Sequence, residues 1–107
     1  MHEFVGKWRI TWMETWPQDY VDLEVFGFFE FSEDGLGSFQ FGAVRGWLDV
    51  RVSSRIPMLE FSWQGEDAGR DCSGRGLFDF PDPDHGEGRL FIHCGEESGV
   101  RIERIST

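Results

Sequence analysis

The segment FVGKWRITWMETW, residues 4–16, decides how this chain folds. It holds three tryptophans spaced four residues apart, Trp8, Trp12 and Trp16. That spacing suits one side of a helix and one side of a strand equally well. The residues between them favour the strand, because the even positions are mostly apolar while the odd positions include Lys7, Arg9 and Thr11. Alternation with a period of two predicts a half-buried strand over residues 4–16.

The rest of the chain has the same character. Fourteen glycines and four prolines interrupt it so often that the longest segment free of both has ten residues, whereas helices average about 11–12 residues. Between the interruptions the residues suit a pleated, half-buried surface. The further predicted strands are Val21–Phe31, Gly37–Arg45, Trp47–Ser53, Met58–Trp63, Gly74–Phe80, Arg89–Cys94 and Val100–Ile105. The residues expected on one face of the first of these are Val21, Leu23, Val25, Phe29 and Phe31.

The connections between these strands are mostly of hairpin length. The longest expected loops are QGEDAGRDCSG at residues 64–74 and PDPDHGEG at residues 81–88. Short strands joined in this way, without helices for crossovers, predict an antiparallel meander. Closing the meander removes its exposed edges, so the expected fold is an all-β, eight-stranded antiparallel up-and-down barrel with residues 1–107 as a single domain. A two-sheet β-sandwich is the alternative.

The letters FVGKW at residues 4–8 resemble the G-x-W signature that opens the first strand of lipocalins and related calycin barrels. In that group a basic residue near the end of the last strand packs across the tryptophan ring, and Arg104 is similar to it in position. The resemblance implies a calycin-like barrel closed at one end by Gly6, Trp8 and Arg104, through a cation–π contact of about 0.5–2 kcal/mol. It also implies an open mouth and, in many members, a hydrophobic ligand. Typical lipocalins are longer and usually exported, and the layout also resembles small bacterial proteins that have no assigned function.

The interior of such a barrel can be filled by side chains or can hold one small ligand. The inward rows expected from the alternation are rich in rings: Trp12, Phe29, Phe41, Phe61, Trp63 and Phe78. Rings at such positions are more often core than pocket, which favours a filled interior. The first function that we expect is nevertheless the binding of a small apolar or aromatic ligand in the mouth, with Trp12, Phe41, Trp63 and His93 as the candidate lining residues.

A second set of aromatic residues is hard to place inside a barrel. Trp16 and Tyr20 flank Pro17 at the first turn. Phe26 and Phe28 are opposite in phase to the apolar face of their own strand, so they are expected on the outside. These residues are candidates for a surface that binds a protein partner or a second copy of the chain, as in a homodimer.

The letters WLDVR at residues 47–51 alternate between apolar and polar side chains. The simpler interpretation is that Asp49 and Arg51 face solvent as cross-strand partners. In the alternative orientation, Trp47, Asp49 and Arg51 face inward and form a polar pocket floor.

The charge of the chain limits its partners. Twenty acidic and ten basic side chains give a formal charge of −10, which repels nucleic-acid phosphates and anionic lipid headgroups. Neither nucleic acid nor a membrane is therefore an expected partner, whereas a cationic protein or small molecule is compatible.

No apolar run approaches the roughly 20 residues of a membrane helix, and the start MHEFVGKW lacks a signal-peptide pattern. We expect a cytoplasmic protein in which Cys72 and Cys94 are reduced thiols.

The residues that could carry chemistry do not form a known pattern. The candidates Cys72, His85, His93 and Cys94 lack the spacing of structural zinc sites. The letters DPDHG at residues 82–86 lack the ligand order of a calcium loop. Nothing assembles a nucleophile with a base and an oxyanion site. No metal, no cofactor and no enzymatic activity are therefore expected.

Overall fold

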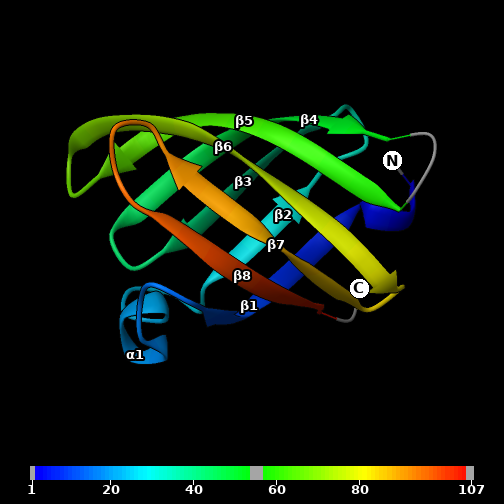
Figure 1. Ribbon diagram of the computed structural model, residues 1–107, viewed down its shortest axis with the longest axis horizontal. Helices are drawn as coiled ribbons and strands as arrows, with labels where there is room; N and C mark the ends of the chain where they lie inside the picture. The colour runs from blue at the N-terminus through cyan, green and yellow to red at the C-terminus, as the bar shows by residue number, and fades with distance from the viewer. Residues whose placement is uncertain (1, 54–56, 106–107) are drawn as a thin grey trace.

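The computed structural model describes residues 2–53 and 57–105 and is a closed β-barrel (Figure 1). Its elements are η1 (His2–Phe4), β1 (Gly6–Met13), α1 (Gln18–Val21), β2 (Phe28–Phe31), β3 (Leu36–Phe41), β4 (Val44–Val52), β5 (Met58–Asp67), β6 (Arg70–Asp82), β7 (His85–Ile92) and β8 (Glu97–Arg104). Each strand pairs antiparallel with the next, and β8 pairs with β1. The predicted all-β, eight-stranded up-and-down barrel is confirmed, and the two-sheet sandwich is wrong.

The first strand changes phase in its second half. Up to Ile10 the even residues face the core, but the register of β1 against β8 shifts between Ile10 and Trp12. A bulge of this kind adds one residue to a strand and turns the side chains that follow it to the other face. Trp12 is therefore 40% exposed on the outer wall while Met13 is buried. The expected inward orientation of Trp12 is wrong.

The predicted strand Val21–Phe31 exists only in its second half. The observed strand β2 covers the last four residues of that range, with Phe29 and Phe31 buried as expected. Leu23 and Val25, expected on the same face, are exposed. This part of the prediction is wrong, because the chain there is not extended.

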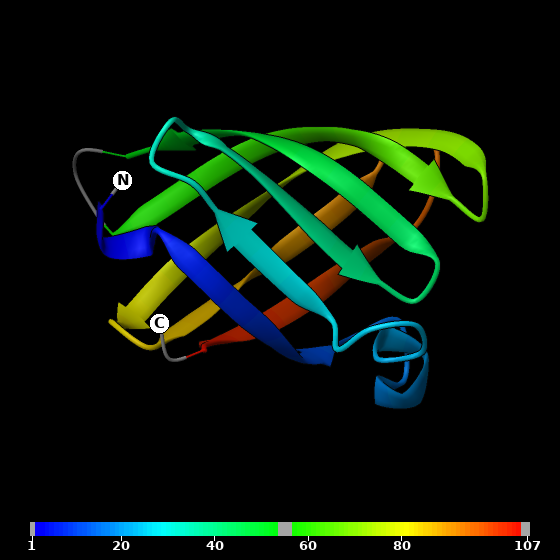
Figure 2. The same ribbon diagram turned by 180° about the vertical axis from the view of Figure 1, so that it is seen from behind.

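Local hydrogen bonds account for the missing half of that strand. The short helix α1 follows Pro17 and lies beside the end of β1, outside the sheet (Figures 1 and 2). The side-chain amide of Gln18 and the backbone N–H of Gly27 both donate to the Asp22 carboxylate, at 3.0 and 2.8 Å. Side-chain bonds like these compete with sheet pairing. The segment therefore forms a helical turn and a loop.

Both long segments predicted as loops are largely hairpin strands. The strands β5 and β6 run on to Asp67 and Arg70, joined by Ala68 and Gly69 with φ angles of 49° and 85°. Two successive residues with positive φ form a tight turn whose twist matches a hairpin. The strands β6 and β7 likewise pair within the predicted loop 81–88. The polar residues of these segments lie on strands, where their side chains face solvent.

The polar row of β4 faces outward. Leu48 and Val50 are buried, whereas Asp49 and Arg51 are exposed. The alternative with a polar pocket floor inside the barrel is therefore wrong. Asp49 and Arg51 form an ion pair with each other along their own strand, at 2.7 Å, rather than across strands.

Rings fill the middle of the barrel. Phe29 on β2 and Phe78 on β6 come from opposite sides, and their ring centroids are 4.9 Å apart. Phe39 and Phe61 lie 5.0 and 5.8 Å from the same Phe29 ring. Gly76 makes room for this packing, since a Cβ added there would lie 2.3 Å from the Phe61 ring. Because side chains from opposite walls touch at this level, no space for a ligand remains between them.

Candidate functional site

The structure separates the four candidate lining residues of an interior ligand site. Phe41 and Trp63 are buried in the core, and the Trp63 indole N–H donates to the Phe91 carbonyl at 3.3 Å. Trp12 lies on the outer wall, and His93 is exposed in the turn after β7. These side chains therefore do not line one common pocket.

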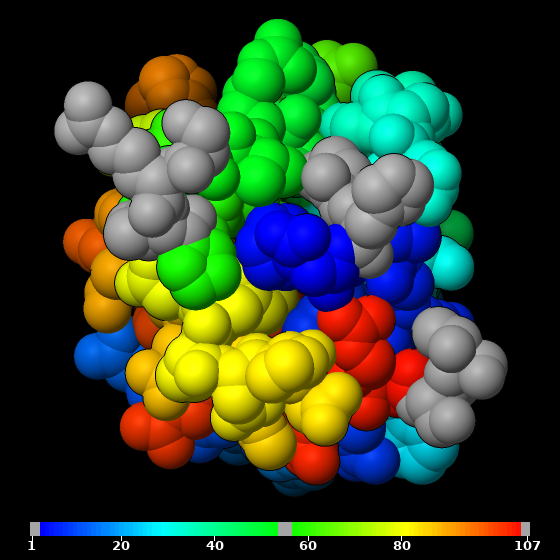
Figure 3. Space-filling model, turned by 90° about the vertical axis from the view of Figure 1, so that its right-hand side faces the viewer, coloured from blue at the N-terminus to red at the C-terminus, as the bar shows by residue number. Residues whose placement is uncertain are grey.

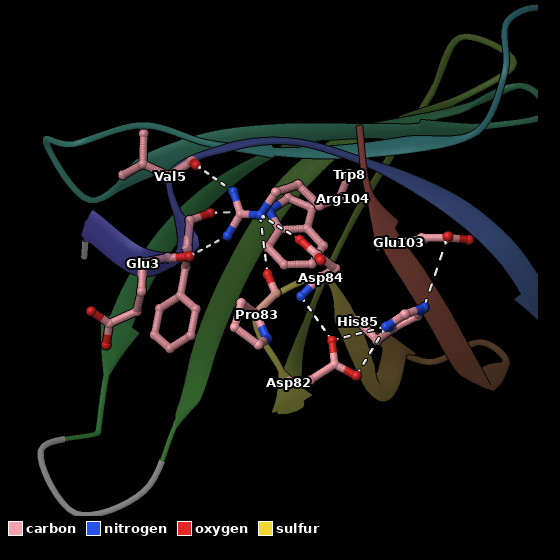
Figure 4. A network of polar contacts seen from close by, with 10 residues as sticks. Glu3, Val5, Trp8, Asp82, Pro83, Asp84, His85, Glu103 and Arg104 are labelled. Carbon is pink, nitrogen blue, oxygen red and sulfur yellow. Dashed lines mark hydrogen bonds and ion pairs between the residues drawn. The ribbon is translucent and has the colours of Figure 1, made fainter. Parts of the chain in front are cut away.

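Arg104 closes one end of the barrel. Its guanidinium lies 4.4 Å from the centre of the Trp8 ring, so the contact expected from the sequence is present. It also donates to the carbonyls of Val5 and Pro83, both at 3.1 Å, and to that of Glu3 (Figure 4). Figure 3 looks onto this end, where the blue N-terminal segment lies against the yellow β6–β7 turn and the red end of β8. Arg104 thus joins three parts of the chain in one floor.

Rings seal this floor from the inside. Gly6 has a φ of 128°, a conformation that side chains with a Cβ rarely adopt, and it leads the chain from η1 into β1. The Trp8 indole N–H donates to the Phe4 carbonyl at 3.0 Å. The Phe4 ring stacks on that of Phe80 at 4.3 Å. Glycine is therefore required where the chain turns inward over the Trp8 ring.

A pair of titratable groups lies on the rim of the floor (Figure 4). His85 Nδ1 is 2.9 Å from the Asp82 carboxylate, and Nε2 is 3.8 Å from Glu103. The hydrogen bond to Asp82 raises the pKa of His85 above its ordinary value, and the same bond lowers the pKa of Asp82. Within residues 2–53 and 57–105, no group of three or more His, Cys, Asp or Glu side chains is arranged to hold a metal ion.

Several aromatic side chains on the outer wall are covered by cations of the same chain. The pairs are Lys7 over Phe28 at 4.5 Å, Arg9 over Phe26 at 4.5 Å, Arg75 over Phe91 at 4.3 Å and Arg101 over Trp12 at 4.7 Å. A cation over an exposed ring gains about 0.5–1 kcal/mol. This contact explains how Phe26, which is 69% exposed, and Phe28 are accommodated outside the core.

Trp16 and Tyr20 belong to the other end of the barrel. The Trp16 ring lies 4.8 Å from that of Phe41. Tyr20 packs on Gly42, where an added Cβ would lie 2.2 Å from its ring, and its hydroxyl accepts a hydrogen bond from the Ala43 N–H at 3.4 Å. Both side chains are half-buried. The predicted partner surface is therefore split between this end and the covered rings of the outer wall.

Trp47 differs from the other exposed rings because no cation of the described residues lies over it. It is 58% exposed in the middle of β4, with Ser38 of β3 and Gln64 of β5 directly opposite. In the described part of the chain, its side chain has no cation, ring or hydrogen-bond partner. Two hollows of about 400 and 530 Å³ meet at this ring. The residues that line the larger one are Trp47, Gln64, Gly65, Glu66, Asp71, Cys72 and Ser73.

Glu66 and Asp71 make the larger hollow negative. They lie directly opposite each other on β5 and β6, and neither has an ion-pair partner among the described residues. Arg45, the cross-strand neighbour of Glu66, lies instead 3.4 Å from Glu24. Burial, and then the charges of Asp67, Asp71 and Glu66 in that order, raise the pKa of the Cys72 thiol. The local field therefore favours cations.

Comparison with known proteins adds no relative. No protein-family model matches the chain, and neither a curated protein nor a solved structure matches it. None of the helices within the described residues is long and apolar enough to cross a membrane. Both cysteines are free thiols. The fold and the site thus define a closed up-and-down β-barrel with a ring-filled interior and an uncovered tryptophan on its wall.

Of the three residues that distinguish this wall, the sequence singles out only Trp47, and only as part of an inward pocket floor; Glu66 and Asp71 are not among its candidates. Trp47 carries a usable signal, because it shares an outward row with Asp49 and Arg51 and is an aromatic residue among charges. Glu66 and Asp71 carry none, since both lie in residues 64–74, whose composition is typical of a loop. Only the hairpin register places them opposite each other.

Proposed function

We propose that this protein is a non-enzymatic binding module that holds a protein partner on the outer wall of its barrel, with Trp47 at the centre of the contact. The observation that carries the proposal is the 58% exposure of Trp47, where other rings on the wall lie under cations of the same chain. Exposed tryptophans are prominent among the residues that dominate binding energy at protein interfaces. The hollows beside the ring give a partner side chain room to enter.

The packing of the interior supports this choice over a small apolar ligand in the barrel. The rings of Phe29 and Phe78 meet across the middle, and at the mouth end the Trp16 ring lies on Phe41. A ligand would have to displace rings whose burial is worth about 1.5–3 kcal/mol each. An interior site is therefore the weaker candidate.

Charge and compartment refine the proposal. A net charge of −10 opposes the pairing of two copies and favours a partner of opposite sign. The floor built from Gly6, Trp8 and Arg104 supports a relationship to the calycins. The free thiols of Cys72 and Cys94 support a reducing, cytoplasmic location.

Affinity capture from a lysate of the host tests the proposal. We expect a protein that the wild type and the Trp12→Ala variant retain and that the Trp47→Ala variant loses. Trp12 is the matched control because its ring is also on the outer wall, 40% exposed, but lies under Arg101. Calorimetry with the purified partner must then show the same dependence. A partner retained equally well after Trp47→Ala would overturn the proposal.

A further inference from the structure

We infer that the Trp47 face, defined as Trp47, Gln64, Glu66, Asp71 and Ser73, takes a lysine or arginine side chain from a basic segment of the partner. The cation lies on the indole ring, and its charge meets the carboxylates of Glu66 and Asp71. This inference rests on the proposed function and names the chemistry of the partner.

The other rings of the barrel wall show how this chain uses such positions. Each of the covered rings on the outer wall has a Lys or Arg group within 4.7 Å of its centroid. Trp47 is more exposed than Trp12, at 58% against 40%, and no cation of the described chain reaches it. Tryptophan is also the aromatic side chain that attracts cations most strongly. Trp47 can therefore make with a cation of another molecule the cation–π contact that the other outer-wall rings make with cations of this chain.

The carboxylates lie where such a cation would carry its charge. Glu66 is two residues beyond Gln64, the cross-strand neighbour of Trp47. Trp47 and Glu66 are therefore diagonal neighbours on the same face, with backbone positions about 7–8 Å apart. Asp71 is directly opposite Glu66, and the same hollow of about 530 Å³ is lined by both and by Trp47. Arg45 forms its ion pair with Glu24, at 3.4 Å, and not with Glu66. A long cationic side chain can thus touch the ring and reach both carboxylates.

Other occupants fit this face less well. A second copy presents the same two carboxylates, so two copies meeting here bring like charges together. A neutral sugar could stack on Trp47 and bond to Gln64 and Ser73, but it would leave both carboxylates without a partner. The field that raises the pKa of Cys72 and the net charge of −10 both steer a basic segment toward the hollow.

Titration of the full chain with acetyl-tetraarginine amide, followed by NMR of the tryptophan indole N–H signals, tests the inference. The Trp47 signal is assigned by its loss in the Trp47→Phe variant. We expect this signal to move on titration, and binding to weaken with added salt. The Glu66→Gln/Asp71→Asn double variant should weaken binding by about tenfold. The matched control is Glu60→Gln/Asp79→Asn, which removes the same charge from the outward faces of the same two strands and should leave binding within about twofold.

Several outcomes would overturn the inference. If the control double variant weakens peptide binding equally, binding depends only on net charge. If the citrulline analogue of the peptide binds equally well, binding does not depend on the charge of the peptide. Movement of the Trp47 signal with cellotetraose and not with tetraarginine would identify a sugar surface. A captured partner that needs Trp47 but ignores Glu66→Gln/Asp71→Asn would end this inference while the proposed function stands.

Discussion

Replacing Phe29 by alanine removes the ring that joins opposite walls of the barrel. Phe29 is fully buried, and its ring lies 4.9–6.2 Å from those of Phe31, Phe39, Phe61 and Phe78. Truncation of a core phenylalanine costs about 3–5 kcal/mol, and the loss of several ring pairs places this case in the upper part of that range, at about 4–5 kcal/mol. The free energy of unfolding of a native domain is about 5–15 kcal/mol, so the variant should still fold but with little stability left.

Urea unfolding followed by circular dichroism measures this loss. The matched control is Phe26→Ala, which removes the same atoms from a ring that is 69% exposed under Arg9, and it should cost less than about 1 kcal/mol. The apolar cavity left by Phe29→Ala should also bind benzene and gain thermal stability from it. If Phe29→Ala lowers the free energy of unfolding no more than the control does, the interior is not filled by packed rings, and the barrel interior is again a candidate ligand site.

Two further predictions concern the closed end. Arg104→Lys keeps the charge but loses the planar guanidinium that donates to carbonyls of the N-terminal segment and of the β6–β7 turn. The free energy of unfolding should therefore fall by about 2–3 kcal/mol. An unchanged urea midpoint would contradict the role of Arg104 in the floor. The hydrogen bond to Asp82 raises the pKa of folded His85 above 6.5, so its contribution is fully present below that pH and is lost as pH rises through the higher folded value. The Tm advantage of the wild type over His85→Gln should therefore shrink as the pH rises above about 6.5. An advantage that grows with pH would contradict the assignment.

The number and order of the strands could be predicted because each strand carries its own alternation, and a meander of short hairpins has few other ways to close. The contact between Trp8 and Arg104 could be predicted from the resemblance to lipocalins, in which a basic residue near the end of the last strand covers the first-strand tryptophan. The orientation of Trp12 could not, since the bulge after Ile10 depends on the pairing of β1 with β8. The loop before β2 depends on hydrogen bonds to Asp22. Neither feature changes the apolar pattern from which strands are recognised.

The rings that lie under cations on the outer wall also could not be identified from the sequence. Arg9 is opposite Phe28 in the register of β1 and β2, yet its guanidinium lies over Phe26, and Lys7 lies over Phe28. These contacts are offset along the sheet, so they depend on the register and on side-chain direction together. The sequence therefore predicts that Phe26 and Phe28 face outward but cannot show that cations cover them. It predicts an aromatic partner surface where the structure has covered rings.

The distribution of cations leads to a last prediction, at a residue outside the Trp47 face. Arg45 is two residues before Trp47 and directly opposite Glu66, and its ion pair is with Glu24 rather than with that carboxylate. Glu24→Ala should release Arg45 to pair with Glu66, which would weaken the binding of acetyl-tetraarginine amide by about two- to threefold.

The control for this prediction is Glu96→Ala, which removes the same charge from the exposed turn between β7 and β8 and should leave the affinity unchanged. Equal weakening by both variants would show that only net charge matters. No weakening by Glu24→Ala would show that Arg45 does not compete for Glu66. If Glu24→Ala alone weakens binding, the face accepts an outside cation because the chain's own nearest cation is held elsewhere.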